Sequence, residues 1–329
     1  MKNVVMKAIV QDEYGEAAAV MRSDKIDEPA VGAAEVLVEV VVAGVDRGAW
    51  HLTAGLPYPV RLAGYGVRAP KDPVRGREFA GRVAAVGSDV TTFGIGDEIY
   101  GVGEGCFAEY ARAEVSKIVP KPKNLTFEQA AATPISALTA LQAVRDQAKV
   151  QAGQTVLIIG ASGGVGTFAV QIAKAFGAVV TAVCSTTKVD LVRSIGADHV
   201  VDYSTEDIGA NGVRYDAVLD IGGGRSLTEL RRLLEPKGTL VIVGSETGGR
   251  WLGGIDRQLR ALLLSPFVSQ KLTMFVSSEN AADLAAISAL IEAGQVIPVV
   301  DRVFPLNETA AAITYMRDGH VRGKVVVTI

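Results

Sequence analysis

Residues 155–166 read TVLIIGASGGVG, and this stretch decides the fold of the chain. Five apolar or β-branched residues followed by glycines are typical of a buried parallel strand that ends in a tight turn. The apolar residues that follow (Phe168, Ala169, Ile172 and Ala173) recur at helical spacing. Strand, glycine turn and helix together predict a dinucleotide-binding turn, because glycines let the backbone approach a pyrophosphate and the helix N-terminus offers N–H donors.

The glycine pattern is imperfect, since the first of the three usual glycine positions is Ala161. A glycine-rich turn without a ligand is therefore the alternative interpretation, but the strand and helix on either side favour a ligand. The positions expected to hold the cofactor here are Ala161, Ser162, Gly163, Gly164 and Val165.

The end of the next predicted strand, 179–184, indicates which dinucleotide binds. A site that prefers NAD would carry Asp or Glu there to hold the ribose 2′-hydroxyl. The chain instead continues with Ser185, Thr186, Thr187 and Lys188. Hydroxyl donors and a positive charge suit a 2′-phosphate, so Ser185, Thr186 and Lys188 predict NADP(H). The alternative is that the hydroxyls only cap the following helix.

Composition excludes several other classes of protein. The 329 residues suffice for about two domains. The net charge is −3, and the sequence has no run of Lys and Arg that would bind nucleic acid or a membrane surface. Two distant cysteines, Cys106 and Cys184, fit a reducing compartment. We expect no transmembrane helix. Residues 1–10 lack the features of a signal peptide, so we expect a cytoplasmic location.

Two regions of different character follow from the hydrophobic patterns. Residues 1–123 carry short strand signals separated by glycine turns, which predict a small barrel-like β domain. From 155 onward strands alternate with helices, which predicts an α/β fold with a doubly wound parallel sheet. The expected strands are 36–43, 80–87, 98–101, 107–110, 155–160, 179–184, 199–202, 217–220, 239–244, 271–276, 299–304 and 324–329. The expected helices are 126–132, 136–149, 166–176, 188–195, 226–234, 281–293 and 307–317.

Short motifs along nearly the whole chain resemble the medium-chain dehydrogenase/reductase superfamily, and within it the zinc-free quinone oxidoreductase branch. The motifs are GREFAG at 76–81, VG at 86–87, GDEIYG at 96–101, FAEY at 107–110, GADHVVDY at 196–203 and GKVVV at 323–327. The resemblance implies a GroES-like catalytic domain of 1–123, to which 296–329 returns. It also implies an inserted Rossmann NADP-binding domain of 124–295, with the cofactor in the cleft between them.

Zinc ligands are missing at the positions where zinc-dependent members of this superfamily carry them. The family's Gly-His-Glu histidine is replaced by Arg77, and Val45-Asp46 stands where the first ligand cysteine lies. Two cysteines and three scattered histidines do not supply a tetrahedral site, so we expect no metal. A short-chain reductase is also excluded, because none of the eight tyrosines is followed by Lys four residues later.

The resemblance places the substrate-side polar residues in the loop 44–51. Asp46 stands where relatives commonly carry Asn, and His51 where they commonly carry Tyr. The candidate catalytic residues are Asp46, His51 and Tyr58. A histidine can donate a proton near neutral pH. The alternatives are a pocket-wall His51, an Asp46 that caps a turn, and a Tyr58 that only packs.

The resemblance also implies further cofactor contacts outside the glycine turn. Thr139 would lie near the nicotinamide, Tyr203 beside the adenosine phosphate, and the strand end at Gly244-Ser245 would border the nicotinamide. The added cofactor-binding candidates are Thr139, Tyr203, Gly222, Gly244, Ser245 and Lys324. Arg77 is expected near the site, or in a salt bridge to Glu78 or Asp97.

These observations predict a zinc-independent, NADPH-dependent oxidoreductase that reduces quinones, enones or related carbonyl compounds by hydride transfer. The alternatives are an alcohol or aldehyde reductase of the same fold and a non-catalytic NADPH-binding protein. The edge strand 271–276 is apolar, and relatives pair through it, so we expect a homodimer.

Overall fold

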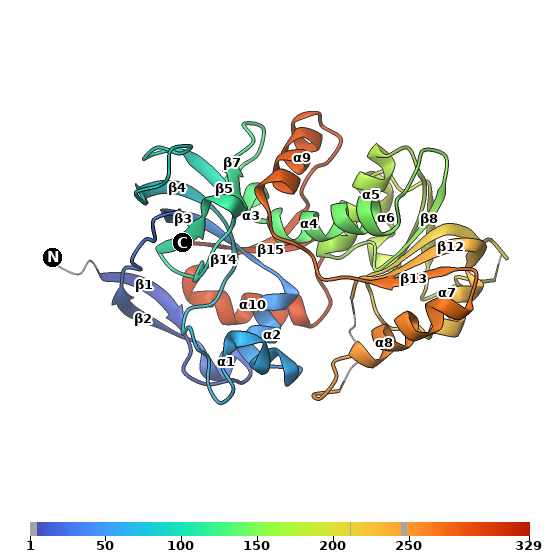
Figure 1. The fold of residues 1–329 in the computed structure, drawn as a ribbon, viewed down its shortest axis with the longest axis horizontal. Coiled ribbons are helices and arrows are strands. Elements are labelled where there is room, and N and C mark those ends of the chain that lie inside the picture. Colours follow the sequence, from blue (N-terminus) through green and yellow to red (C-terminus); the bar gives the residue numbers. More distant parts are fainter. Residues whose placement is uncertain (1–4, 211, 245–248) are drawn as a thin grey trace. The chain divides into compact units, whose positions relative to one another are not determined.

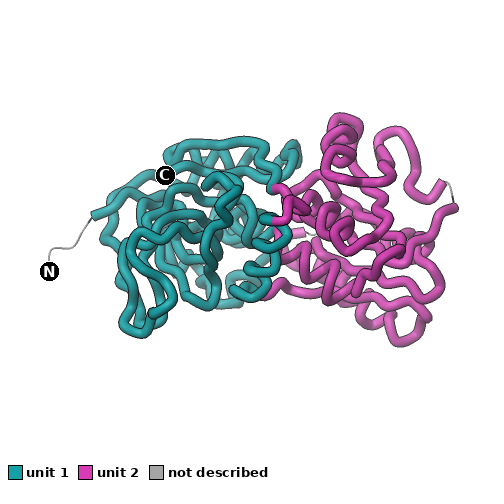
Figure 2. Tube along the Cα trace, turned by 90° about the horizontal axis from the view of Figure 1, so that it is seen from above, with its two compact units in different colours: residues 1–136, 279–292, 298–329 teal, residues 137–278, 293–297 magenta. Residues whose placement is uncertain are grey.

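The computed structural model describes residues 5–210, 212–244 and 249–329 (Figure 1). The chain divides into two compact units, which Figure 2 colours separately. The first unit holds residues 1–136, 279–292 and 298–329, and the second holds 137–278 and 293–297. The domain division expected from the sequence, 1–123 with 296–329 against 124–295, stays a prediction.

The first unit is built on a seven-stranded sheet in the order β14-β15-β3-β4-β5-β7, with β6 also paired to β3. β3 (Glu35–Val45) is long and mostly buried, which follows from its run of valines. Around it packs a core that includes Phe79, Phe107 and Ile99. The remaining strands are β4 (Glu78–Val86), β5 (Glu98–Val102), β6 (Tyr110–Glu114), β7 (Ile118–Pro120), β14 (Val300–Pro305) and β15 (Lys324–Thr328), and a separate pair joins β1 (Val5–Val10) to β2 (Arg22–Asp27).

One strand prediction in this unit was wrong in its bounds. The strand expected at 107–110 begins only at Tyr110, as β6. Phe107 instead exchanges backbone hydrogen bonds with two different segments, donating to Arg75 and accepting from Ile9, both at 2.9 Å. Next to it, Ala108 forms an isolated bridge with Ala8, so the pairing there does not extend into a ladder.

Helices of the first unit follow local capping signals. Thr126 and Gln129 form the predicted capping box at the start of α3 (Phe127–Ala131), with hydrogen bonds of 3.2 and 3.3 Å. Asp46 caps α2 (Arg47–Ala54) with one hydrogen bond, in which its side chain accepts from the Ala49 amide. The sequence interpretation treated this helix as a loop. The others are α1 (Ala17–Val20), a π-turn at Arg61–Tyr65, 3-10 turns at Val115–Lys117 and Leu306–Glu308, α9 (Ala281–Glu292) and α10 (Thr309–Arg317).

The second unit contains the parallel sheet that the glycine stretch predicts. Its strand order is β10-β9-β8-β11-β12-β13, and every neighbouring pair is parallel. The order reverses between β8 and β11, the place where doubly wound sheets bind dinucleotides. The α/β fold prediction is confirmed. The strands are β8 (Thr155–Ile159), β9 (Val179–Cys184), β10 (His199–Asp202), β11 (Tyr215–Asp220), β12 (Leu234–Ile242) and β13 (Lys271–Met274).

α5 (Gly164–Ala175) contacts β8 and β9 and buries Phe168, Ala169 and Ile172, as its apolar spacing predicts. The predicted helix 136–149 appears as α4 (Pro134–Gln142), which a π-turn at Ala143–Gln147 continues. The other helices are α6 (Val189–Ser194), α7 (Leu227–Arg232) and α8 (Ile255–Leu264), with 3-10 turns at Thr186–Lys188 and Ser265–Phe267. The sequence interpretation missed α8.

Candidate active site

The turn after β8 is shaped for close approach of a ligand to the backbone. Gly160 has φ +83°, which favours glycine. A β-carbon at Gly166 would lie 2.1 Å from the carbonyl oxygen of Gly160, so only glycine fits there. Gly163 is the N-cap of α5 and offers no side-chain acceptor to the first N–H groups of the helix. These N–H groups, at the positive end of the helix dipole, suit a pyrophosphate.

Two further loops reach the same edge of the sheet. A β-carbon at Gly160 would meet the amide nitrogen of Gly222 at 2.9 Å, and one at Gly244 would meet the carbonyl oxygen of Ile221 at 2.3 Å. The ends of β8, β11 and β12 are therefore packed backbone against backbone. The structure thus brings together the candidates of the glycine turn with Gly222 and Gly244, whereas Ser245 lies outside the described residues.

A buried ion pair that the sequence interpretation missed holds these loops. The Asp220 carboxylate is 0% exposed, receives a 2.5 Å hydrogen bond from Arg257 of α8, and accepts from the Gly223 amide at 3.1 Å. Arg257 also donates to the carbonyl oxygens of Arg225 and Gly244, at 2.8 and 3.0 Å. Burial raises the pKa of Asp220, while Arg257 acts in the opposite direction. The paired charges connect three chain segments at this edge of the sheet.

The strand end at 184–188 combines the predicted donors with an unforeseen carboxylate. Ser185 and Lys188 are half-buried and Thr186 is exposed. The Thr186 hydroxyl donates to Asp202 at 2.5 Å, because β10 pairs beside β9 and sets Asp202 opposite Cys184. This hydrogen bond and that from the Ser204 amide hold the pKa of Asp202 below its usual range. The next residue, Tyr203, is 56% exposed.

The candidate catalytic residues of α2 are both held by hydrogen bonds. Asp46 Oδ1 accepts from the Ala49 amide at 2.7 Å, so its capping role is present. His51 Nδ1 lies 2.7 Å from the carbonyl oxygen of Leu56. A carbonyl can only accept, so Nδ1 donates this hydrogen bond and carries a proton. The ring also lies against Trp50, with centroids 4.7 Å apart.

Tyr58 packs in a cation–π arrangement. The Arg61 guanidinium lies 5.0 Å from the centre of the Tyr58 ring and 4.4 Å from that of Tyr14. The Tyr14 hydroxyl donates to the carbonyl oxygens of Tyr65 and Gly66, at 2.8 and 2.7 Å. Tyr58 is thus part of a packed aromatic–arginine cluster, which was the alternative that the sequence allowed.

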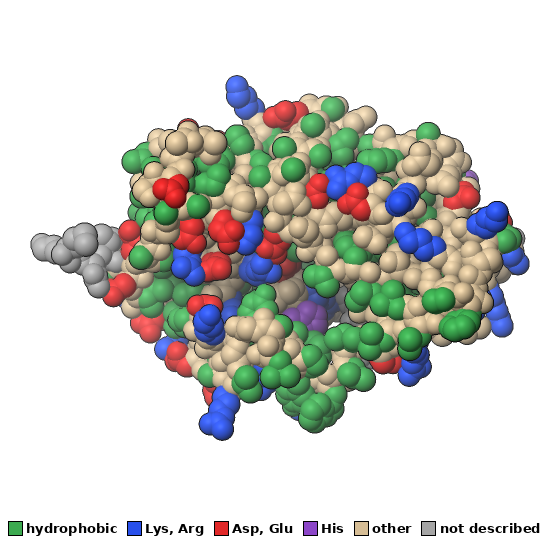
Figure 3. All heavy atoms as spheres, in the orientation of Figure 1, with side chains coloured by type: hydrophobic (Ala, Val, Ile, Leu, Met, Phe, Trp, Pro, Cys, Tyr) green, Lys and Arg blue, Asp and Glu red, His purple; other side chains and the backbone are tan. Residues whose placement is uncertain are grey.

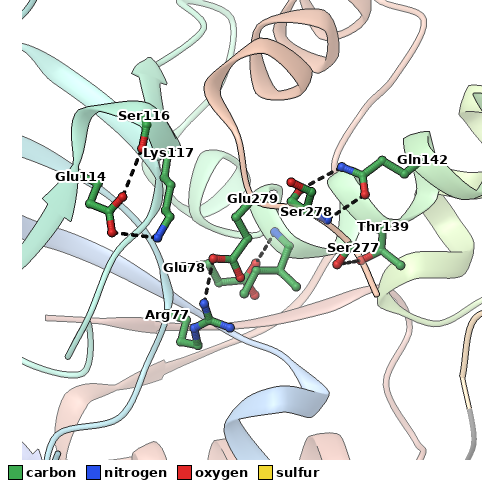
Figure 4. Close-up of polar contacts among 11 residues, drawn as sticks. Arg77, Glu78, Glu114, Ser116, Lys117, Thr139, Gln142, Ser277, Ser278 and Glu279 are labelled. Atoms are coloured by element: carbon green, nitrogen blue, oxygen red, sulfur yellow. Dashed lines mark hydrogen bonds and ion pairs between the residues drawn. The ribbon is translucent and has the colours of Figure 1, made fainter. Parts of the chain in front are cut away.

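Two ion pairs of the first unit lie side by side at the start of β4 (Figure 4). Arg77 pairs with Glu279 at 2.7 Å, not with Glu78 or Asp97. Burial lowers the pKa of Arg77, but the groups around it, of which Glu279 has the largest effect, together raise that pKa. Lys324 and Glu78 form a short ion pair, with side chains 2% and 1% exposed. The Lys324 ammonium is therefore engaged by a carboxylate, and its cofactor contact stays a prediction.

Thr139 of the second unit donates to the Ser277 hydroxyl at 3.1 Å, and one turn later Gln142 bonds to both backbone groups of Ser278 (Figure 4). Helix α4 is thereby tied to the segment that follows β13. Thr139 takes part in this polar contact, and its expected place near the nicotinamide stays a prediction.

Within residues 5–210, 212–244 and 249–329, no three His, Cys, Asp or Glu side chains gather in a way that could hold a metal ion. Over the same residues no helix is long and apolar enough to cross a membrane. Basic and acidic side chains are interspersed on the face drawn in Figure 3.

Two family models match this chain. Residues 32–123 match the alcohol dehydrogenase GroES-like domain, and residues 195–327 match a model described as zinc-binding dehydrogenase. Among characterised relatives, the NAD(P)H oxidoreductase RTN4IP1, mitochondrial, of Mus musculus is 32% identical over 100% of this chain and 90% of its own length. The chloroplast envelope quinone oxidoreductase homolog of Arabidopsis thaliana is 30% identical over 99% of both chains. The NADPH-dependent alkenal/one oxidoreductase, chloroplastic, of the same plant is 32% identical over 98% of this chain and 79% of its own.

Solved structures agree with these relatives. The quinone oxidoreductase from Coxiella burnetii superposes with a TM-score of 0.84 at 28% identity, covering 99% of this chain and 100% of its own. A mycobacterial protein complexed with NADPH gives 0.82 at 25% identity, covering 98% and 100%.

The fold and the glycine turn define a member of the medium-chain dehydrogenase/reductase superfamily, and the chain belongs to its quinone oxidoreductase-like branch. It is an oxidoreductase. The resemblance inferred from the motifs is confirmed.

Proposed function

We propose that the protein is a zinc-independent, NADPH-dependent oxidoreductase that reduces quinones, enones or related carbonyl compounds by hydride transfer. The observation that carries the proposal is the glycine turn at the switch point of the sheet, where Gly163 leaves the first turn of α5 without a side-chain cap. The relatives named as NAD(P)H, quinone and alkenal/one oxidoreductases support a nicotinamide cofactor and this substrate class.

Zinc independence is supported by the residues themselves. Arg77 occupies the place of a ligand histidine and is engaged by Glu279. A catalytic zinc needs about three protein ligands, and the described residues offer no such cluster. The name of the matching zinc-binding model describes that model and does not supply ligands here. Metal analysis that finds one zinc per chain in the pure active enzyme would contradict the proposal.

A bound reduced nicotinamide supplies the hydride. The residues of the chain hold and orient it: the turn 160–166 and the N–H groups of α5 bind the pyrophosphate, and Gly222 and Gly244 admit the dinucleotide at the strand ends. His51 holds its ring in place through Nδ1, so its Nε2 is the atom that would give a proton to the reduced oxygen. If so, His51→Gln lowers turnover by roughly tenfold or more at unchanged NADPH affinity.

The direct test is NADPH consumption with a quinone, an enone and a saturated aldehyde in parallel, each repeated with NADH. We expect turnover with the quinone or the enone, and faster with NADPH than with NADH. Turnover confined to the saturated aldehyde would instead indicate an aldehyde reductase of the same fold. No turnover with any of the three would contradict the proposed substrate class.

Preference for NADPH depends on the charges at the end of β9. Lys188 supplies a cation, and Asp202 supplies a carboxylate that is already bonded to Thr186. We expect Lys188→Ala to raise the dissociation constant for NADPH by roughly tenfold and that for NADH by much less, since only NADPH carries the 2′-phosphate. The control Asp202→Asn removes the repelling charge and should tighten NADPH binding. Fluorescence titration measures both, and equal effects of Lys188→Ala on the two nucleotides would contradict the assignment.

We also propose a homodimer that forms through β13, which ends the strand order of the second sheet. Nearby, Phe267 and Val276 are 84% and 87% exposed, so pairing would cover apolar surface. Light scattering on a sizing column should give twice the chain mass, and a monomer at micromolar concentration would refute this.

A cytoplasmic location stays a prediction, and cell fractionation tests it.

A further inference from the structure

The turn that follows α2 fixes the side chain of His51. The Leu56 amide donates to the His51 carbonyl oxygen at 3.1 Å, and His51 Nδ1 lies 2.7 Å from the carbonyl oxygen of Leu56. Gly55 makes the turn between them, with φ +62° in the left-handed region that favours glycine. The direction of the imidazole ring therefore depends on how the backbone of residues 55–56 is oriented.

Arg61 holds the peptide group that joins Gly55 to Leu56. Arg61 Nε donates to the Gly55 carbonyl oxygen at 2.8 Å. This carbonyl and the Leu56 amide belong to one planar unit, so a contact at the oxygen also sets the direction of the N–H bond at the other end. A β-carbon on Gly55 would lie 2.7 Å from Arg61 Nε and 2.5 Å from the Tyr14 ring. The guanidinium and the ring are thus packed directly against the turn.

Two aromatic rings hold the Arg61 guanidinium in its turn. The guanidinium carbon lies 4.4 Å from the centre of the Tyr14 ring and 5.0 Å from that of Tyr58. The side chain is also half-buried. A planar guanidinium that is stacked in this way has less freedom to rotate than a surface arginine, so its Nε–H bond stays directed at one acceptor.

The segment that carries Arg61 has other anchors of its own. The Tyr14 hydroxyl donates to the carbonyl oxygens of Tyr65 and Gly66, at 2.8 and 2.7 Å. These bonds attach the far end of the segment without help from Arg61. The hydrogen bond to Gly55 is the contact that connects Arg61 to the end of α2, where His51 lies.

We propose that Arg61 is a positioning residue for His51. This inference rests on the proposed function, in which His51 gives a proton to the reduced oxygen. By fixing the peptide group between Gly55 and Leu56, Arg61 keeps the Leu56 carbonyl oxygen where Nδ1 can donate to it. The proton then leaves from the opposite side of the ring. The Nε2–H bond breaks, an O–H bond forms on the substrate, and the imidazole keeps its remaining proton on Nδ1 until water restores the other.

The test is a double-mutant cycle on the full chain, with NADPH and the acceptor that the wild type reduces. We expect Arg61→Met to lower kcat by roughly threefold to tenfold, while KM and the dissociation constant for NADPH change by less than about twofold. In the His51→Gln background, Arg61→Met should change kcat by less than about twofold, because the proton donor that it positions is already absent. A residue that only supports the fold would lower kcat by a similar factor in both backgrounds.

A spectroscopic measurement reports on the hydrogen bond itself. The chain has three histidines, and magnetic resonance of protein with isotope-labelled histidine identifies the Nδ1–H signal of His51 as the one lost in His51→Gln. We expect this signal in the wild type, and we expect Arg61→Met to broaden it through faster exchange with water. The measurement needs no substrate, so it tests the positioning separately from the reductase assay.

Two further variants are matched controls. Arg68→Met removes an exposed arginine of the same segment, and it should leave kcat and the Nδ1–H signal unchanged. Arg61→Lys keeps a cation that can donate to the Gly55 carbonyl oxygen but loses the planar stacking on the rings, so it should retain part of the turnover. Melting temperatures establish that each variant is folded, and Arg61→Lys takes the place of Arg61→Met in the cycle if the latter is not.

Three results would overturn the inference alone. These are wild-type kcat in Arg61→Met beside a low kcat in His51→Gln, an equal loss of kcat from Arg61→Met in both backgrounds, and an unchanged Nδ1–H signal in Arg61→Met. Full turnover in His51→Gln would instead refute the proton-donor role of His51 in the proposed function, and the inference would fall with it.

Discussion

Lys324→Met lowers the free energy of unfolding of the first unit by roughly 3–5 kcal/mol, the cost of leaving one member of a buried ion pair without its partner. Both side chains of the Lys324–Glu78 pair are almost fully buried, so water cannot replace the lost ammonium. Glu78 Oε2 is also bound, by the Ile135 amide at 3.1 Å, so the carboxylate is held in place. Calorimetric melting and urea unfolding measure the loss.

The pH dependence of this variant distinguishes charge from packing. Burial raises the pKa of Glu78 and Lys324 opposes the shift, so removing Lys324 raises that pKa further. At pH values above the pKa of Glu78 in the unfolded chain, the folded variant therefore keeps a proton on Glu78 that the unfolded chain has lost. The stability of Lys324→Met therefore falls as pH rises, and the loss relative to the wild type is smaller at pH 5 than at pH 8.

Two controls accompany this prediction. Glu78→Gln with Lys324→Met keeps an acceptor for the Ile135 amide and removes both charges, so it should recover most of the stability and lose the pH dependence. Lys117→Met breaks the partly exposed pair with Glu114, and it should cost less than about 1 kcal/mol. Equal losses in Lys324→Met and Lys117→Met would contradict the account of the buried pair.

Gly166→Ala is expected to weaken cofactor binding and to destabilise the second unit by roughly 1–3 kcal/mol, the range for overpacking a tight site. Its β-carbon would lie 2.1 Å from the Gly160 carbonyl oxygen and 2.7 Å from the Ala161 backbone. Both neighbours are main chain, so the turn itself must move. Because that turn carries the donors for the pyrophosphate, the dissociation constant for NADPH should rise by more than about tenfold.

Gly163→Ala separates the two effects. A β-carbon there would lie 3.6 Å from the nearest atom, so the fold should accept it, but the methyl group would stand where a pyrophosphate approaches the helix. We expect unchanged melting and weakened NADPH binding. Gly209→Ala, where the nearest atom is 3.7 Å away, should change neither. Normal NADPH affinity in both Gly166→Ala and Gly163→Ala would show that the turn does not hold the cofactor.

Local patterns predicted most of the fold. The apolar run before Gly160 and the helical spacing after it gave β8 and α5 within two residues. Thr126 and Gln129 gave the start of α3. α2 was missed although Asp46 is a capping residue, because Gly48 and the short apolar run after it did not suggest a helix.

The site was harder to predict because its polar partners are distant in the sequence. Glu279 lies 202 positions after Arg77, and Lys324 lies 246 after Glu78. Asp202 reaches Thr186 only through the pairing of β9 with β10. Periodicity describes which face of an element is buried, but it does not say which elements meet.

The Arg257 network limits how the segment around α8 can be exchanged between relatives. Arg257 connects α8 to Asp220 and to the carbonyl oxygens of Arg225 and Gly244. In a chimaera whose replacement helix has no arginine at this position, the buried Asp220 carboxylate loses its partner. The carbonyl oxygens of Arg225 and Gly244 lose their hydrogen bonds at the same time. Engineers who graft this segment to change substrate range must therefore transfer the arginine and the aspartate as a pair.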